Sequence, residues 1–376
     1  MIVVHFPSWF PDAAKPLNGN FILRQIEAVG RCTDSIILHH TSDDYTPDIP
    51  ENIHFQPIHY HNKIDLLTAY ISEFKKVIEK YGKPDLIHLH IALPLGPIAA
   101  HLARKYHIPL IISEHWSVYQ PMNRHQLNIF QRKALQYTYS TASHITAVSQ
   151  NLLNNICATV PAAVKKPQTV VGNVVDTNLF SLKDSGLFNG KKQILHVSTL
   201  DNDAKNIMGI LHAINQLSLQ RSDFELNIVH DFQNREAEEY VRTNGLSNIV
   251  HFLGRKTSEE IVDLLHQSAF FLLFSNYENQ PCVLLESFCT GTPVVTTPVG
   301  GIPEIANENN AVFVTPKYED QLVEKLDYIL NNGKQFYPEI IRKQAEDICS
   351  PDVIGKKWTR IYHSITATAN GQKANS

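Results

Sequence analysis

The fold is decided by a strand, loop and helix that read FLLFSNYENQPCVLLE, residues 271–286. The apolar run at 271–274 predicts a strand buried on both faces, and Pro281 suits the first turn of the helix that follows. Glu278 then stands in the loop at the strand's carboxyl end, and Glu286 stands on the helix. The N–H groups and positive dipole end of such a helix predict a phosphate-binding site. Carboxylates beside it can accept hydrogen bonds from sugar or ribose hydroxyls.

Taken alone, these two glutamates also have a plainer interpretation. Glu278 would then be an ordinary loop carboxylate and Glu286 a solvated helix residue. In a binding site, each glutamate could contribute on the order of 1.5–3 kcal/mol through a charge-assisted hydrogen bond to a bound hydroxyl. The surrounding sequence has to decide between the two.

Short β-branched and aromatic runs recur on both sides of this unit. They predict strands at 2–6, 36–39, 86–89, 110–113, 145–148 and 169–171, and then at 194–197, 226–229, 249–252, 271–274, 294–296 and 311–314. Helix-period segments lie between them, for example at 64–81, 98–106, 207–219, 259–267 and 319–331. Buried strands that alternate with helices predict parallel sheets covered on both faces. The strands are too many for one compact sheet, so the fold class is α/β with two doubly wound domains.

We expect the domains to span residues 1–185 and 186–350, because the stretch 184–191 is polar and carries two glycines. A last helix, from Pro351 to about Thr366, carries Trp358 and Tyr362 and is expected to cross back to the first domain. The tail after Ala367 is polar and is expected to fray. In doubly wound sheets ligands collect at the carboxyl ends of the strands, which directs attention to the loops there.

Composition excludes several classes of function. A formal net charge of −4 gives no electrostatic reason to expect a nucleic-acid partner. Five scattered cysteines without a C-x-x-C pair favour a reducing compartment, and the histidines show no metal-ligand spacing, so no metal site is expected. The N-terminus reads as a buried strand instead of a signal peptide, and no apolar run reaches the ~18 residues of a membrane span. A cytoplasmic protein is therefore expected, and peripheral contact with a membrane stays open.

Two further motifs follow the opening stretch, GTPVV at 291–295 and GGIPE at 300–304. With the pair of glutamates, they resemble the signature of the retaining glycosyltransferases of family 4. The resemblance implies the GT-B architecture, in which two Rossmann-like domains face a central cleft. It places the nucleotide sugar on the second domain and the acceptor on the first. It implies that Glu278 contacts the donor sugar, Glu286 contacts the ribose, and Asn279 belongs to the same donor site.

Lys205 stands between the predicted strand 194–197 and the helix 207–219. It matches the lysine that family members direct at the donor diphosphate, where a fixed cation stabilises the charge of the leaving group; a plain surface lysine is the alternative. Many relatives carry an arginine just after this strand, whereas this chain reads Ser198-Thr199-Leu200. The Asp201-Asn202-Asp203 segment reads as an acidic loop, because the resemblance implies transfer without a metal ion or another cofactor.

Two residues of the first half, Gly19 and His115, match the family as well, and a third candidate follows from its position at a strand end. Gly19 resembles the glycine loop that faces the donor phosphates, with a simple turn and helix cap as the alternative. His115 matches the histidine placed beside the donor sugar and acceptor, with a core histidine as the alternative. Of His88 and His90 at the end of strand 86–89, one is expected to be structural, and His90 is the better cleft candidate on the acceptor side.

The resemblance therefore predicts an enzyme that moves a sugar from a nucleotide-sugar donor to a saccharide or lipid-linked acceptor, as in polysaccharide or glycolipid assembly. No carboxylate is clearly placed as a nucleophile, so a same-face transfer assisted by the leaving diphosphate is favoured. Two other functions stay open. A nucleotide-sugar epimerase of the same architecture would isomerise the donor without an acceptor, and a non-catalytic two-lobed binding protein would bind without turnover.

Overall fold

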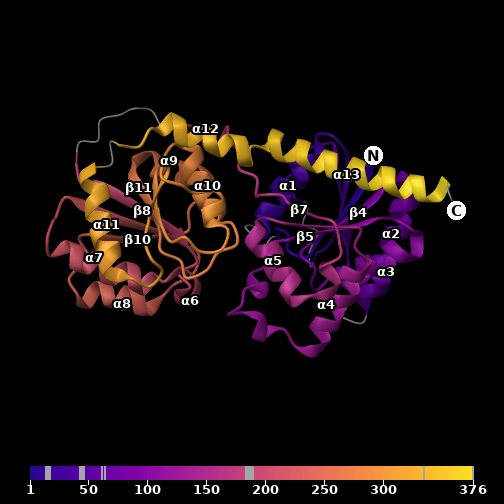
Figure 1. The fold of residues 1–376 in the computed structure, drawn as a ribbon, viewed down its shortest axis with the longest axis horizontal. Helices are drawn as coiled ribbons and strands as arrows, with labels where there is room; N and C mark the ends of the chain where they lie inside the picture. The colour runs from indigo at the N-terminus through magenta and orange to yellow at the C-terminus, as the bar shows by residue number, and fades with distance from the viewer. Residues whose placement is uncertain are drawn as a thin grey trace. The chain divides into compact units, whose positions relative to one another are not determined.

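A computed structural model of the chain describes residues 1–12, 18–41, 47–60, 62, 65–182, 190–332 and 335–374, the last six as backbone alone. The chain forms two compact units (Figure 1). Unit 1 comprises Met1–Val174 together with Pro351–Ser376, and unit 2 comprises Val175–Ser350. Each unit is built around its own parallel sheet.

The sheet of unit 1 has seven parallel strands in the order β3-β2-β1-β4-β5-β6-β7. The strand order reverses between β1 and β4, which is the switch point of a doubly wound sheet. The strands are β1 (Ile2–Pro7), β2 (Asp34–His40), β3 (Ile53–Ile58), β4 (Leu86–His90), β5 (Leu110–Glu114), β6 (His144–Ala147) and β7 (Gln168–Val170).

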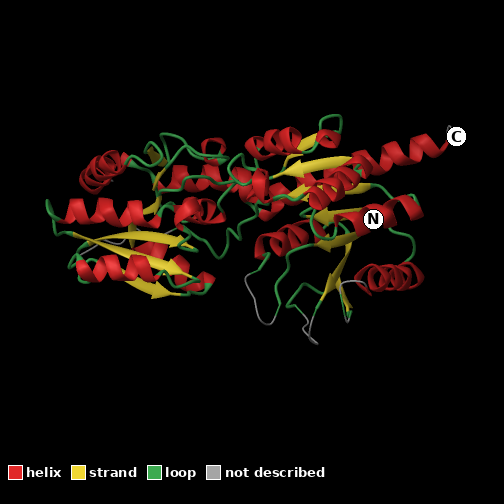
Figure 2. Cartoon of the chain, turned by 90° about the horizontal axis from the view of Figure 1, so that it is seen from below, coloured by secondary structure: helices red, strands yellow, loops and turns green. Residues whose placement is uncertain are grey.

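Helices cover both faces of this sheet (Figure 2). Their starts are fixed locally: Asn128 and Gln131 form a capping box on α4, and the Ser149 side chain caps α5. The helices are α1 (Asn20–Gly30), α2 (Asp65–Tyr81), α3 (Gly96–Tyr106), α4 (Ile129–Thr141), α5 (Gln150–Thr159) and α13 (Pro351–Ala374), with short 3₁₀ turns η1 (Ser117–Tyr119), η2 (Arg124–Gln126) and η3 (Pro161–Ala163).

Unit 2 repeats this plan with six parallel strands in the order β10-β9-β8-β11-β12-β13, which reverses between β8 and β11. Its strands are β8 (Lys192–Ser198), β9 (Phe224–His230), β10 (Val250–Gly254), β11 (Ser268–Leu273), β12 (Val294–Thr296) and β13 (Ala311–Phe313). Its helices are α6 (Asn202–Lys205), α7 (Ile207–Ser218), α8 (Arg235–Thr243), α9 (Ser258–Gln267), α10 (Cys282–Cys289), α11 (Glu319–Asn332) and α12 (Pro338–Cys349), with a 3₁₀ turn η4 (Ile302–Glu304).

The last helix, α13, belongs to unit 1 and completes its core. Trp358 and Tyr362 are buried together with Val3 and Val29, which come from the first strand and the first helix. Gly355 allows the helices to approach closely, because a Cβ there would lie 2.5 Å from the Ala28 carbonyl oxygen. The helix extends to Ala374 instead of ending near Thr366. The extra residues include alanines, the residue with the highest helix propensity, and no proline.

The predicted strands are all present, and one strand escaped the sequence analysis. β3 contains polar residues and Pro57, which lacks the N–H that a central strand must donate. The structure places β3 at the edge of the sheet, where one side of the strand has no neighbour and a proline is tolerated. The predicted start of the second helix at Ile64 lies outside the described residues, and α2 begins at Asp65.

The two units divide at Val174/Val175, earlier than the expected 185/186. Much of the polar stretch that suggested the later boundary, 184–189, lies outside the described residues. The segment after Val174 is attached to unit 2 by hydrogen bonds: the Val175 N–H donates to the Cys349 carbonyl, and the Arg342 guanidinium donates to the Thr177 and Phe180 carbonyls at 2.9 and 2.8 Å. Phe180 is buried in the core of unit 2.

Arg342 is therefore expected to stabilise unit 2 measurably. It also donates to the Cys289 carbonyl at 2.6 Å, so Arg342→Met would leave three carbonyls without this donor. We expect a loss of about 2–4 kcal/mol in the free energy of unfolding, while Lys343→Met on the exposed side of α12 changes it little. All three tryptophans lie in unit 1, so the unfolding of unit 2 in urea should be followed by far-UV circular dichroism. Equal effects of the two substitutions would contradict the anchoring role.

Candidate active site

The loop after β8 positions Lys205 at the carboxyl edge of the unit 2 sheet. α6 is a single turn, capped by the Asp201 carboxylate, which accepts a hydrogen bond from the Asp203 N–H at 3.0 Å. Asn206 then takes a left-handed conformation (φ 51°), which ends α6 and lets α7 begin at Ile207. Lys205 is thus the last residue of this short, capped turn. The Asp201 carboxylate serves as a helix cap, and Asn202 and Asp203 lie in α6, so most of the predicted acidic loop is a helical turn.

The loop after β11 positions Glu278. The Ser275 hydroxyl donates to Glu278 Oε1 at 2.8 Å, and the Thr297 hydroxyl after β12 donates to the Ser275 carbonyl at 2.6 Å. The Asn276 N–H donates to the Ala204 carbonyl at 2.8 Å, which ties this loop to α6. The following helix begins at Cys282, and Pro281 is its N-cap instead of a residue of its first turn.

The two loops bring Lys205 and Glu278 into direct contact. Lys205 Nζ lies 2.5 Å from Glu278 Oε1, and both side chains are largely shielded from solvent. β8 and β11 are the neighbouring strands between which the order of the sheet reverses, so this pair occupies the switch point where doubly wound sheets bind ligands. A partly buried ion pair beside the start of α10 can exchange its partners for the charges and hydroxyls of a bound phosphate sugar.

Gly300 packs against the backbone of Glu278. Its φ of +57° favours glycine, and a Cβ at this position would lie 1.7 Å from the Glu278 carbonyl oxygen. The turn that carries Gly300 follows β12 and leads into η4 at Ile302. The GGIPE motif therefore serves to fix the loop that bears Glu278.

Two further donor-site candidates of unit 2 lie in the loop that carries Glu278 and on the helix that follows it. Asn279 follows Glu278 directly and is half-buried, and Glu286 lies one turn into α10 with a buried side chain. Sequence reasoning did not single out Ser275, Asn276 or Thr297, whose contacts orient Glu278. Their positions could have indicated this role, because each is a polar residue just beyond the end of a buried strand.

In unit 1 the structure brings Gly19 and His115 to the same neighbourhood. Gly19 precedes α1 with φ +71°, and a Cβ there would lie 2.5 Å from the Trp9 carbonyl oxygen, so the turn requires glycine. Phe21, on the first turn of α1, contacts the His115 ring at a centroid distance of 4.8 Å. Burial lowers the pKa of His115 to about 3, so the imidazole is neutral and can both donate and accept a hydrogen bond.

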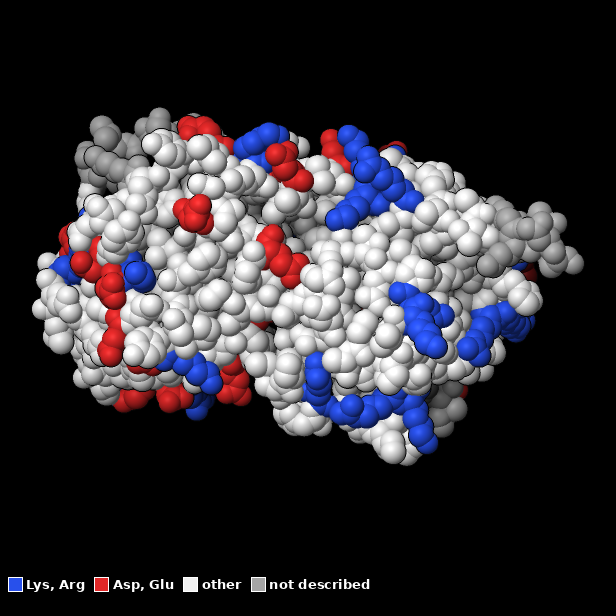
Figure 3. All heavy atoms as spheres, viewed as in Figure 1, with Lys and Arg blue, Asp and Glu red and all other residues white. Residues whose placement is uncertain are grey.

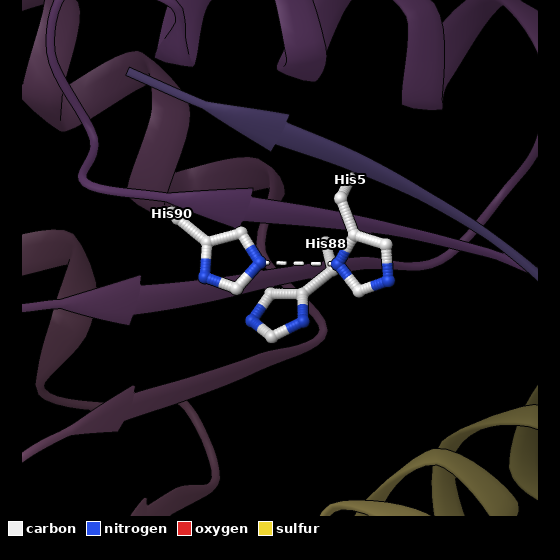
Figure 4. A group of neighbouring side chains, drawn as sticks. All are labelled: His5, His88 and His90. Carbon is white, nitrogen blue, oxygen red and sulfur yellow. Dashed lines mark hydrogen bonds between the residues drawn. The ribbon is translucent and has the colours of Figure 1, made fainter. Parts of the chain in front are cut away.

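His90 lies deeper than expected. The sequence favours His90 for the cleft because it stands at a strand end, whereas the structure buries its ring completely among His5 and His88 (Figure 4). His5 Nδ1 lies 3.1 Å from His90 Nε2, and the His88 ring pairs with Tyr362 and Ser113 at 2.6 and 2.8 Å. α13 supplies Tyr362, so the C-terminal helix seals this cluster from one side.

Among the described residues, these three histidines form the one group whose ligand atoms, all within 4.8 Å of one another, could hold a metal ion. Most of their ring nitrogens are already used: His5 Nε2 pairs with Ser35 at 3.2 Å, and only His90 Nδ1 in the group lacks a hydrogen-bond partner among described atoms. Burial lowers the pKa of His5 to about 3 and, with the neighbouring rings, lowers the pKa of His90 well below its usual value. The geometry is that of a neutral hydrogen-bonded network.

Two family profiles match this chain. The family profile described as Glycosyltransferase Family 4 matches residues 31–179, and the one described as Glycosyl transferases group 1 matches residues 179–347. The two profiles follow one another without a gap and together match residues 31–347, which lie in both units. The chain belongs to the family 4 type of glycosyltransferase.

Relatives of this glycosyltransferase support the same assignment. An MMP alpha-(1->4)-mannosyltransferase from Mycolicibacterium hassiacum is 27% identical over 198 residues, which cover 51% of this chain and 47% of that enzyme. The chain thus spans about half the length of that relative.

Solved structures show the GT-B architecture over the whole chain. Sucrose-phosphate synthase from Thermosynechococcus elongatus superposes with a TM-score of 0.82 at 17% identity and covers 98% of this chain and 100% of that protein. The Anabaena protein HepE, solved in complex with UDP, gives a TM-score of 0.75 at 17% identity and covers 96% of this chain and 99% of HepE. No helix among the described residues of the glycosyltransferase is long and apolar enough to cross a membrane.

The close approach at Gly300 makes a specific prediction. Gly300→Ala adds both an unfavourable φ and a clash with Glu278, whereas Gly245→Ala, at φ +70° with nothing within 4 Å of its Cβ, adds only the unfavourable φ. We expect Gly245→Ala to cost about 1–2 kcal/mol and Gly300→Ala to cost at least about 2 kcal/mol more. Urea unfolding followed by circular dichroism measures both, and similar losses would show that the turn does not clamp Glu278.

The neutral histidines predict loss of stability in mild acid. An unfolded histidine takes up a proton near pH 6.5, whereas His5 stays neutral in the fold until about pH 3. Stability is therefore complete above about pH 7 and falls as the pH drops below about 6.5, by up to about 1.4 kcal/mol per pH unit for each such histidine.

The matched variants are His5→Gln and, as a control on the surface, His101→Gln. We expect His5→Gln to reduce the slope of the unfolding free energy against pH between pH 6.5 and 4. The reduction should be up to about 1.4 kcal/mol per pH unit, which corresponds to the uptake of one proton. The second should leave that slope unchanged, since His101 is exposed. Identical slopes in wild type and His5→Gln would refute the assignment of a neutral buried ring.

Proposed function

We propose that the protein transfers a sugar from a nucleotide-sugar donor to a saccharide or lipid-linked acceptor with retention of the anomeric configuration. The observation that carries this proposal is the contact between Lys205 Nζ and Glu278 Oε1 at the switch point of unit 2. One cation and one carboxylate, held at the start of a helix, are what a sugar diphosphate requires. The cation binds the phosphates, and the carboxylate binds the hydroxyls.

The donor diphosphate would draw Lys205 away from Glu278. As the bond between the anomeric carbon and the diphosphate oxygen lengthens, negative charge develops on the leaving group. The ammonium group and the N–H groups at the start of α10 stabilise that charge. Both are fixed before the reaction, Lys205 by the capped turn α6 and the helix by β11, so little reorganisation is needed.

Glu278, freed from Lys205, accepts hydrogen bonds from the hydroxyls of the donor sugar, and Ser275 keeps its carboxylate oriented. Asn279 and Glu286 complete the donor site, with Glu286 on the ribose. In unit 1, Gly19 offers backbone N–H groups to the phosphates. The neutral His115 orients the acceptor hydroxyl, whose proton passes to the leaving diphosphate.

The UDP bound to HepE supports a nucleotide diphosphate as the leaving group. We propose that transfer needs no metal ion, since Asp201 is used as a helix cap and Lys205 supplies a fixed positive charge. We also propose that the enzyme acts in the cytoplasm, in the assembly of a polysaccharide or glycolipid. Its five free cysteines agree with a reducing compartment.

The decisive variants are Lys205→Ala and Glu278→Ala. We expect each to lower kcat for transfer from a labelled nucleotide sugar by about 10²–10³-fold, because each removes a charged group that acts on the reacting centre. The double variant should lose much less than the product of the two single losses, since the residues act as a unit.

Lys343 and Asp347 form an exposed ion pair on α12 and provide the matched control. Lys343→Ala and Asp347→Ala should leave kcat within about twofold. Transfer at the wild-type rate by folded Glu278→Ala protein would refute the proposal. Isomerised donor without transfer would instead favour an epimerase, and binding without turnover across a panel of acceptors would favour a binding protein.

A further inference from the structure

Unit 1 contains a long segment with almost no acidic residues. Between Leu86 and Val174 the sequence has one carboxylate, Glu114, against seven basic residues: Arg104, Lys105, Arg124, Arg132, Lys133, Lys165 and Lys166. Glu114 is buried, accepts hydrogen bonds from the Tyr119 and Tyr139 hydroxyls, and has its pKa raised by burial. None of the seven basic side chains forms an ion pair with a carboxylate in the described part of the chain. The surface of this segment is therefore strongly positive although the whole chain is slightly negative.

Packing gathers these charges around α4. Lys166 Nζ donates to the Ser140 carbonyl at 2.7 Å, and Arg104 Nε donates to the Thr141 hydroxyl at 2.9 Å, so both lie at the carboxyl end of the helix. Arg132 and Lys133 are exposed near its start. In the face drawn in Figure 3, Lys and Arg gather over the part of unit 1 where Figure 1 places α3 and α4, with almost no acidic residue among them.

Large apolar side chains stand among these charges. Ile129 and Phe130, the first two residues of α4, are 64% and 79% exposed, and Val164 beyond η3 is also exposed. A groove of about 290 Å³ beside them is lined by Ile129, Lys133 and Pro161, among others, and so joins α4 to η3. Exposing an adjacent aromatic and aliphatic pair to water is unfavourable, which indicates that a partner covers them.

We propose that this surface, formed by Ile129, Phe130, Lys133, Val164 and Lys165, docks unit 1 onto a lipid bilayer with anionic headgroups. Phe130 and Ile129 would enter the boundary between headgroups and acyl chains, while the basic side chains around them face the phosphates. A nucleic acid would match the charge, whereas an anionic bilayer matches the charge and also takes up exposed aliphatic side chains such as Ile129 and Val164 at the boundary of its acyl chains. The proposal does not depend on the transfer reaction, because it concerns binding without turnover.

The experiment uses the full chain and sedimentation with vesicles of phosphatidylcholine alone or mixed with phosphatidylglycerol. We expect binding to the anionic vesicles, little binding to the neutral ones, and weaker binding as salt increases. Phe130→Ser should weaken binding roughly tenfold, since it removes the largest inserted side chain. Lys133→Gln combined with Lys165→Gln should weaken it roughly twenty-five-fold, at about fivefold per charge.

The matched controls lie in unit 2: Phe232→Ser, which removes a phenylalanine that is 64% exposed, and Lys343→Gln, which removes an exposed lysine. Both should bind vesicles like the wild type. All the substituted side chains are exposed, so the variants should keep the circular dichroism and thermal midpoint of the wild type. Equal binding by the α4 variants and the controls, or no binding to anionic vesicles, would overturn the proposal. So would a dimer in sedimentation equilibrium that Phe130→Ser dissociates, or retention of RNA that depends on the same lysines.

Discussion

Lys205 and Glu278 are 73 positions apart in the sequence, and they meet because β8 and β11 are neighbouring parallel strands. Parallel strands release their loops at the same edge, so two loops that follow adjacent strands converge there. A buried carboxylate without a cationic partner would be costly, and a buried lysine without a carboxylate equally so. This mutual requirement explains the surrounding detail: the capped turn α6, the Ser275 and Thr297 hydroxyls, and a glycine at position 300 that lets two loops approach closely.

The same ion pair could open when a charged ligand binds. With Lys205 and Glu278 satisfied by each other, neither charge is buried without a partner, and a sugar diphosphate can replace both partners at once. An uncharged sugar would have to break the pair without supplying an anion for the lysine. Under the proposed function, this arrangement would favour donors in which phosphate and hydroxyls arrive together.

The switch point of unit 1 contains neutral histidines instead of an ion pair. Its switch point between β1 and β4 is filled by His5, His88 and His90, which burial keeps neutral. His5 pairs with His90 and Ser35, and His88 pairs with Ser113 and Tyr362. This interior carries almost no charge, whereas the outer surface around α4 is basic. Because the buried histidines are neutral, the sheet can be packed tightly although it contains polar side chains. The charges of unit 1 that could attract an anionic partner lie on its exterior.

Much of the fold could be predicted from the sequence, because a buried parallel strand is written locally as a short apolar run and the helices between strands carry their own period. The resemblance of residues 278–304 to a family signature predicted Glu278 and Glu286 as site residues without coordinates, and a separate match to the family's lysine predicted Lys205. β3 could not be found in this way, since Pro57 and polar neighbours are tolerated only at an edge, and whether a strand lies at an edge is set by the whole sheet. The sequence could not show that Val175 begins unit 2, that Ser275 and Gly300 orient Glu278, or that His90 is buried against His5 and His88. Each of these depends on contacts between residues far apart in the chain, and only the tertiary structure decides which distant residues meet.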